Sequence, residues 1–144
     1  MAWTSALPAW VLWLAAGVLL LAALGLWAEL RHKYRMRRYV LAELKAIQQR
    51  FNTQGDQVRY LQELNLLLRR IAVRNFYRSR VEGLSGDEWL DFLDWSRSQR
   101  DMKKPGFREG CGRVLDQRIY EAEPELFDPV ALDRLVRLWI KRQT

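Results

Sequence analysis

The side chains that most often act as a catalytic base or nucleophile are scarce in this 144-residue chain, which contains one histidine, His32, and one cysteine, Cys111. His32 lies in the run RHKYRMRR, where its neighbours are cations and offer no partner for general-base or metal chemistry. Arg108 and Arg113 flank Cys111 and would lower its thiol pKa, but no histidine base is near it in the sequence. We therefore expect an inert thiol. Because one cysteine forms no internal disulfide, nothing in the sequence requires an oxidising compartment.

An acidic row, Asp87, Asp91 and Asp94, falls on one side of a predicted helix. Such a row suggests a metal site, but hard cations need oxygens that converge from a shaped loop, which one helix face does not provide. We predict no metal here. We expect these carboxylates to pair instead with arginines of the preceding helix.

An arginine row, Arg70, Arg74 and Arg78, repeats every four residues on that preceding helix. Water is its default environment, and an acidic partner or a lipid headgroup are the alternatives. Charge rows set register and partner choice more than affinity. The arginine row and the acidic row are therefore our candidate partner-docking residues.

Glycines are concentrated in the segment SQRDMKKPGFREGCG, residues 98–112, which is typical of a loop. A phosphate-binding loop needs its second glycine to be followed by lysine and then serine or threonine, and Gly110, Cys111 and Gly112 supply neither. We predict no bound nucleotide or other cofactor. With no recognisable base, nucleophile or metal site, we expect a protein that is not an enzyme.

Residues 8–28, PAWVLWLAAGVLLLAALGLWA, contain no charge and predict a transmembrane helix of about 31 Å. Tryptophans lie near both ends of this segment, where amphipathic rings settle at the level of the lipid headgroups. A cleaved secretory signal is the alternative, but such a signal begins with a positively charged region that is missing here. Residues 29–54 follow as a basic juxtamembrane region and an amphipathic stem helix, in which Val40, Leu44, Ile47 and Phe51 recur at helical spacing.

Five of the 24 basic residues lie just after this span, and much of the formal net charge of +7 comes from them. The positive-inside rule then places residues 1–7 in the periplasm and the rest of the chain in the cytoplasm, so we predict a single-pass protein of the bacterial inner membrane. We expect the five cations to contact anionic lipid headgroups, and we expect no specific nucleic acid, because the surplus charge is not on the folded domain. The five are Arg31, Lys33, Arg35, Arg37 and Arg38.

Residues 55–144 predict a small cytoplasmic domain of about four helices, and the fold class is all-α. Asp56 is placed to cap a helix that runs to about Tyr77. Ser85 and Glu88 form a capping box before the next helix, a short helix is expected over residues 113–120, and Asp128 precedes a final helix. A heptad pattern in the stem is too short and too polar to predict a dimer, so the sequence does not fix the oligomeric state.

The order of these features resembles a family of uncharacterised bacterial membrane proteins classed as a domain of unknown function. The resemblance covers nearly the whole chain and rests on the tryptophan-rich span, RHKYRMRR, LQELNLLLRRIA, FYRSRVEGLSGDEWLDFLD, Tyr120 before an acidic stretch, and LWIKR. Members are usually encoded between a MoxR-type AAA+ ATPase and von Willebrand factor A-domain (Bat-type) proteins, and the resemblance implies these as partners. It carries no catalytic residues.

The resemblance implies a non-enzymatic adaptor or assembly subunit, anchored in the membrane, that docks a component of the ATPase system. The alternative is a module at the inner membrane that binds anionic lipid or nucleic acid through the basic stem and loop. An enzyme with an unrecognised site is a third and weaker hypothesis.

Overall fold

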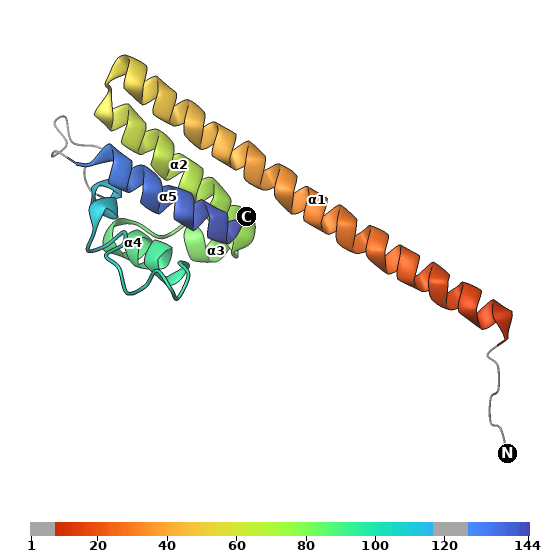
Figure 1. Ribbon diagram of the computed structural model, residues 1–144. Coiled ribbons are helices and arrows are strands. Elements are labelled where there is room, and N and C mark those ends of the chain that lie inside the picture. Colours follow the sequence, from red (N-terminus) through yellow and green to blue (C-terminus); the bar gives the residue numbers. More distant parts are fainter. Residues whose placement is uncertain (1–7, 117–126) are drawn as a thin grey trace. The chain divides into compact units, whose positions relative to one another are not determined.

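The computed structural model describes residues 8–116 and 127–144, and within these ranges it contains five α-helices and no β-strand. The predicted all-α class is confirmed. The helices are α1 (Ala9–Gln54), α2 (Gln57–Asn75), α3 (Arg78–Val81), α4 (Gly86–Trp95) and α5 (Pro129–Gln143), with a 3-10 helix, η1 (Cys111–Leu115), before α5 (Figure 1). The chain divides into two compact units, one ending at Met36 and the other beginning at Arg37.

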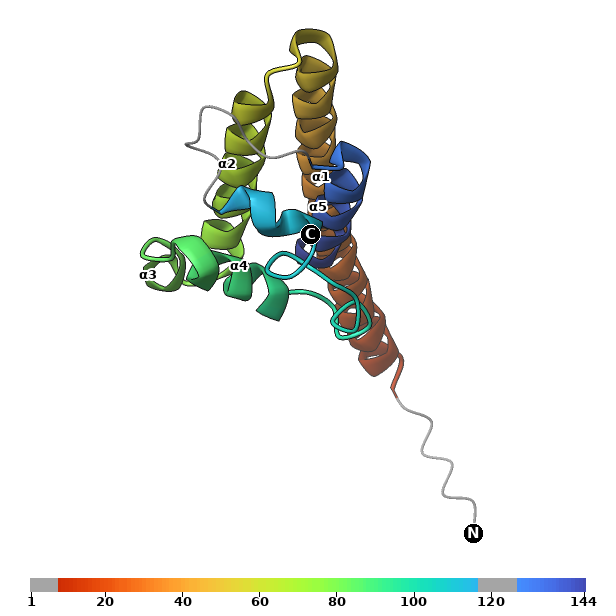
Figure 2. The same ribbon diagram turned by 90° about the vertical axis from the view of Figure 1, so that its left-hand side faces the viewer.

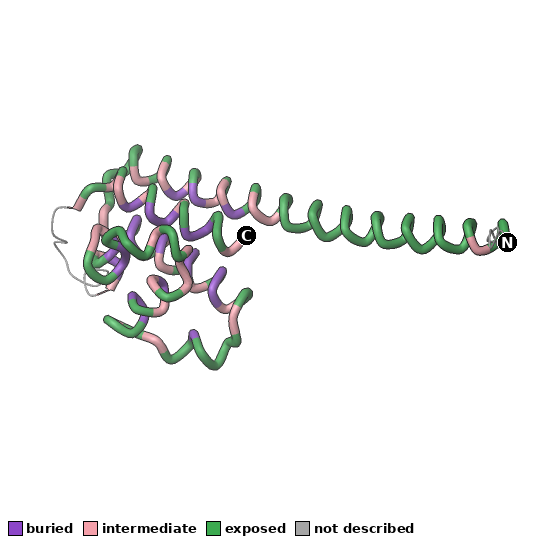
Figure 3. Tube along the Cα trace, turned by 60° about the horizontal axis from the view of Figure 1, so that its bottom comes forward, coloured by how far each residue is buried: buried purple, intermediate pink, exposed green. Residues whose placement is uncertain are grey.

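The first unit contains the N-terminal part of α1. Its described residues are exposed except for the partly buried Val11 and Met36 (Figure 3). This part of α1 includes a segment that is long and apolar enough to cross a membrane, and none of that segment is buried in the protein. An exposed apolar surface of this length is solvated better by the hydrocarbon of a bilayer than by water.

The helix boundaries of the second unit follow local signals in the sequence. α1 ends at Gln54, where Gly55 adopts a φ of +67°, a conformation that favours glycine. The Asp56 carboxylate accepts a hydrogen bond from the backbone N–H of Arg59 at 3.1 Å and caps α2. Asp128 caps α5 in the same way, with Pro129 at the first helical position. The predictions for both caps are confirmed.

The core of the second unit consists of aliphatic and aromatic side chains contributed by every helix of the unit. α2 and α5 pack side by side (Figures 1 and 2). The predicted apolar stripes are buried except for Phe51 of α1, which is partly buried against the core. The buried members are Val40, Leu44 and Ile47 on α1; Leu61, Leu64, Leu68, Ile71 and Ala72 on α2; and Leu132, Leu135, Val136 and Trp139 on α5. Among the described residues, the buried side chains of the core are aliphatic or aromatic, and the charged side chain of Arg97 is only 7% exposed.

The structure corrects three details of the predicted elements. α2 ends at Asn75, because Phe76 takes an extended conformation, so Arg78 belongs to α3. α4 begins after Ser85 as predicted, but in the described structure the Ser85 side chain makes no capping hydrogen bond. The helix expected over residues 113–120 is η1, Cys111–Leu115, and positions 117–120 lie outside the described residues.

Candidate functional site

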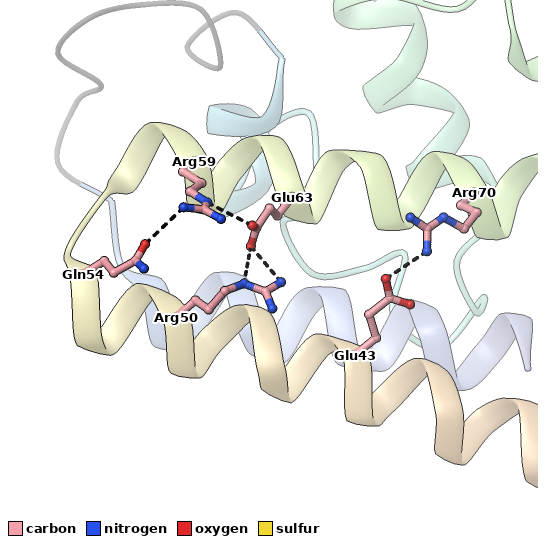
Figure 4. A network of polar contacts seen from close by, with 6 residues as sticks. All are labelled: Glu43, Arg50, Gln54, Arg59, Glu63 and Arg70. Atoms are coloured by element: carbon pink, nitrogen blue, oxygen red, sulfur yellow. Dashed lines mark hydrogen bonds and ion pairs between the residues drawn. The ribbon is translucent and has the colours of Figure 1, made fainter.

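The arginine row does not pair with the acidic row as we predicted. Arg70 of α2 donates a hydrogen bond to the carboxylate of Glu43 on α1 at 2.8 Å (Figure 4). Arg78, on α3, pairs with Glu82, four residues further along the chain. Arg74 is exposed near the end of α2. The prediction is wrong for Arg70 and Arg78 because each arginine reaches a closer carboxylate on α1 or next to its own helix.

A second polar network joins α1 to α2 beside the Arg70 pair (Figure 4). Glu63 accepts hydrogen bonds from Arg50 of α1 at 3.1 Å and from Arg59 at 3.2 Å. Exposed pairs of this kind each contribute only about 0–1 kcal/mol to stability. Their main effect is to fix how α1 and α2 align, while the buried stripes stabilise the pair.

Asp87 and Asp91 are exposed on α4 and share one basic partner, Arg108, from the loop between α4 and η1. A guanidinium nitrogen of Arg108 lies 2.9 and 2.8 Å from the two carboxylate oxygens of Asp91, and another lies 3.7 Å from Asp87. The hydrogen bonds to Asp91, and then the charges of Asp91 and Asp87, raise the pKa of Arg108. Asp87 and Asp91 therefore share the single guanidinium of Arg108, and Lys103 and Lys104 of the same loop line the hollow that Asp91 adjoins.

Asp94 has a different environment from the other two aspartates, because its carboxylate holds the following loop. It accepts hydrogen bonds from the backbone N–H groups of Phe107 at 2.9 Å and Arg108 at 3.0 Å. It also pairs at 3.1 Å with Arg97, whose side chain is only 7% exposed and donates to backbone carbonyls of the same loop. These bonds use the oxygens of Asp94 for the fold, so we no longer place Asp94 on a docking surface.

The glycines of the loop allow chain segments to approach each other closely. A Cβ atom added at Gly106 would lie 2.1 Å from a carboxylate oxygen of Asp94, and one at Gly110 would lie 2.5 Å from the carbonyl oxygen of Gly106. A Cβ at Gly112 would lie 2.7 Å from the Cα atom of Phe107. This packing accounts for the glycine-rich composition of the loop.

The two residues of most obvious chemical interest belong to different units of the chain. His32 is exposed on α1 within the first unit. Cys111 begins η1, and burial raises the pKa of its thiol, with Asp128 acting in the same direction. Among the described residues, no group of three histidine, cysteine or acidic side chains is placed to hold a metal ion.

The basic run divides between the two units. Arg31, Lys33 and Arg35 are exposed on the α1 segment of the first unit, where the Arg31 guanidinium lies 5.0 Å from the centre of the Trp27 ring. Arg37 belongs to the second unit and donates a hydrogen bond to the backbone carbonyl of Lys141 at 3.4 Å. Arg38 is exposed beside it.

A hollow of about 520 Å³ lies beside α4, and the sequence did not predict it. Its lining includes Asp91, Arg108, Trp95 and Met102. Trp95 is 58% exposed and Met102 is 49% exposed. The roles of Arg97 and Arg108 were also missed, and the only signal for them was that a basic loop follows an acidic helix.

The fold and these surfaces define a class of protein: an all-α chain, as far as the structure describes it, with one candidate membrane-spanning helix and a helical unit that has an apolar core. The chain belongs to the family described as Domain of unknown function (DUF4381), which matches residues 1–142. No curated protein and no solved structure matches this chain. The resemblance to a family of unknown function is thus confirmed, and the association with ATPase and von Willebrand genes stays a prediction.

Proposed function

We propose that this protein is a non-enzymatic adaptor or assembly subunit that holds a partner protein at the bacterial inner membrane. In this proposal residues 8–28 of the chain span the bilayer and the second unit lies in the cytoplasm. The observation that carries the proposal is the hollow beside α4. It combines the exposed Trp95 and Met102, side chains of the types that anchor protein interfaces, with the half-exposed carboxylate of Asp91.

The docking surface that we propose is the outer side of α4 with its loop, called the α4 surface below: Asp87, Asp91, Trp95, Met102 and Arg108. Because the acidic and arginine rows do not pair with each other, they form separate surfaces, and only the acidic one adjoins the hollow. Anchoring raises the local concentration of both partners, so a contact of modest area is sufficient.

The partners that we propose are a MoxR-type AAA+ ATPase, a von Willebrand factor A-domain membrane protein, or both. The family resemblance supports this choice through gene neighbourhood. The chemistry of the α4 surface also suits a von Willebrand partner, because such domains grip proteins through a metal-dependent site, and a hard cation takes carboxylate oxygens. Asp87 is the freer carboxylate, since its contact with Arg108 is 3.7 Å long.

Charge reversal tests the proposal in the full-length protein, purified in mild detergent after co-expression with each partner. We expect Asp87→Lys combined with Asp91→Lys to lower the recovered partner at least about tenfold, since close charge pairs at interfaces couple by 1.5 kcal/mol or more. Trp95→Ala should act in the same direction, whereas Leu66→Ala, at a side chain 59% exposed on α2, should have no effect. Release by a chelator would assign the contact to the von Willebrand domain.

The arginine row provides the comparison. We expect Arg70→Glu combined with Arg74→Glu to leave recovery of the partner unchanged. Loss of the partner in this variant alone would place docking on the arginine row. Retention of both partners in all of these variants would contradict an adaptor role for the α4 surface.

A further inference from the structure

Seven cations gather at one end of the second unit, where α2 and α5 both terminate. The side chain of Asn75, the last residue of α2, donates a hydrogen bond to the backbone carbonyl of Gln143 at the end of α5, at 2.8 Å. Arg37 of α1 reaches the carbonyl of Lys141 on the same end of α5, and α3 directly follows α2. We call this set the basic end face: Arg37, Arg38, Arg74, Arg78, Arg80, Lys141 and Arg142.

The positive charge of the basic end face exceeds what the fold needs. Glu82 neutralises Arg78. Arg80, Lys141 and Arg142 are exposed, and their side chains make no hydrogen bond or ion pair with the residues that the structure describes. The C-terminal ends of α2 and α5 together present about one negative charge from their dipoles, which is less than the three positive charges of Arg80, Lys141 and Arg142.

The chain that leaves this end leads directly to the apolar segment. The stretch from Ala28 to Arg37 is so short that even a fully extended chain would keep the second unit within about 30 Å of the apolar segment. Two exposed tyrosines adjoin the cations, Tyr39 at 66% and Tyr77 at 81% exposure, and amphipathic rings of this kind settle at headgroup level.

We propose that the basic end face of the second unit rests on the anionic phospholipid headgroups of the membrane in which the chain is anchored. This contact is independent of the adaptor function, because it needs no partner protein. It differs from a contact of the juxtamembrane run alone, since α2, α3 and α5 supply five of its seven cations.

The contact would also orient the α4 surface. The last turn of α4 adjoins the end of α5, because the Trp139 ring N–H donates to the Ser96 hydroxyl at 2.8 Å and the Gln143 amide donates to the Ser96 carbonyl at 2.8 Å. α4 therefore has its C-terminal end toward the basic end face, and Asp87 lies roughly 13 Å further away along the helix. A unit that rests on lipid through this end leaves Asp87 accessible to a cytoplasmic partner.

The test measures how close two positions come to lipid headgroups, using full-length protein in nanodiscs. In a Cys111→Ser background, a fluorophore is placed by Ser79→Cys, an exposed position between Arg78 and Arg80, or by Asn52→Cys, an exposed position near the other end of the unit. The nanodiscs contain phosphatidylcholine with or without phosphatidylglycerol, together with a lipid that carries a headgroup quencher. We expect quenching at position 79 to be strong only with phosphatidylglycerol, and quenching at position 52 to be weak in both.

Two double variants with the same change in net charge decide whether the basic end face is responsible. Arg80→Glu with Arg142→Glu should lower the ratio of docked to undocked protein at least about 30-fold, which returns quenching to its value in neutral lipid. Lys45→Glu with Arg134→Glu should leave quenching unchanged, because these exposed positions lie roughly 12 Å along α1 and α5 from the face.

Equal quenching at position 79 in neutral and anionic nanodiscs would overturn the proposal, as would equal effects of the two double variants. Shielding of position 79 that appears only after an acidic partner protein is added would also overturn it, and would assign the face to that protein. Circular dichroism of each variant confirms that its helices are intact, so that a loss of quenching reports docking.

Discussion

Replacing Asp94 by alanine is expected to lower the free energy of unfolding of the second unit by about 3 kcal/mol, although the side chain lies on an acidic row that looks like a solvent-exposed face. The substitution leaves the N–H groups of Phe107 and Arg108 without their acceptor and removes the carboxylate beside the nearly buried Arg97. Asp94→Asn should cost about half as much, because an amide keeps one accepting oxygen and loses the charge. Urea titration of the full-length protein in mild detergent, followed by tryptophan fluorescence, measures the change.

Asp91→Ala is the matched control for this prediction. Its ion pair with Arg108 involves side chains that are 52% and 45% exposed, and such pairs are worth less than about 1 kcal/mol. Similar losses for Asp91→Ala and Asp94→Ala would mean that the hydrogen bonds from the loop to Asp94 do not stabilise the unit.

Replacing Gly112 by alanine should also destabilise the second unit by about 3 kcal/mol. The new Cβ atom would lie 2.7 Å from both the Cα atom and a ring carbon of Phe107, and 3.1 Å from a methyl group of Leu135. Phe107 is completely buried and its backbone is bonded to Asp94, so it has no room to move aside. Thermal unfolding followed by circular dichroism is a sufficient measurement.

Gly83→Ala provides the comparison, because a Cβ atom there meets nothing within 4 Å. Its stability should stay within about 1 kcal/mol of the parent, with a gain favoured because alanine restricts the unfolded chain. If both alanine variants unfold at the parent temperature, the close approach of η1 to Phe107 is not a constraint on the fold.

The regular parts of the fold could be predicted because their signals are local. A short side chain with an accepting oxygen caps a helix that begins directly after it, as Asp56 and Asp128 do. The apolar residues from Leu61 to Ala72 recur with the period of a helix. The pairing of the charge rows could not be predicted in this way. Arg70 pairs with Glu43, 27 positions earlier in the chain, and no local pattern indicates which of several carboxylates a long side chain will reach.

The loop after α4 shows the same limit. It has no hydrophobic period, so nothing in its sequence indicated that Phe107 is fully buried or that Gly106 and Gly112 touch neighbouring segments. The sequence predicted a loop without a phosphate site there, and only the structure shows that steric contact accounts for the glycines. The α4 surface was half predicted: its carboxylates were identified from spacing, while Arg108 and the hollow with Trp95 were not.

The sequence by itself determined that this chain is helical, that it carries one segment apolar enough to cross a membrane, and which helix faces are buried, because helix periodicity and hydropathy are properties of neighbouring residues. Only the tertiary structure separated Asp94 from Asp87 and Asp91 and brought the cations of α1, α2 and α5 to one end. The roles of Asp94 and of these cations depend on which residues far apart in the sequence come into contact, and the packing of the apolar core determines those contacts.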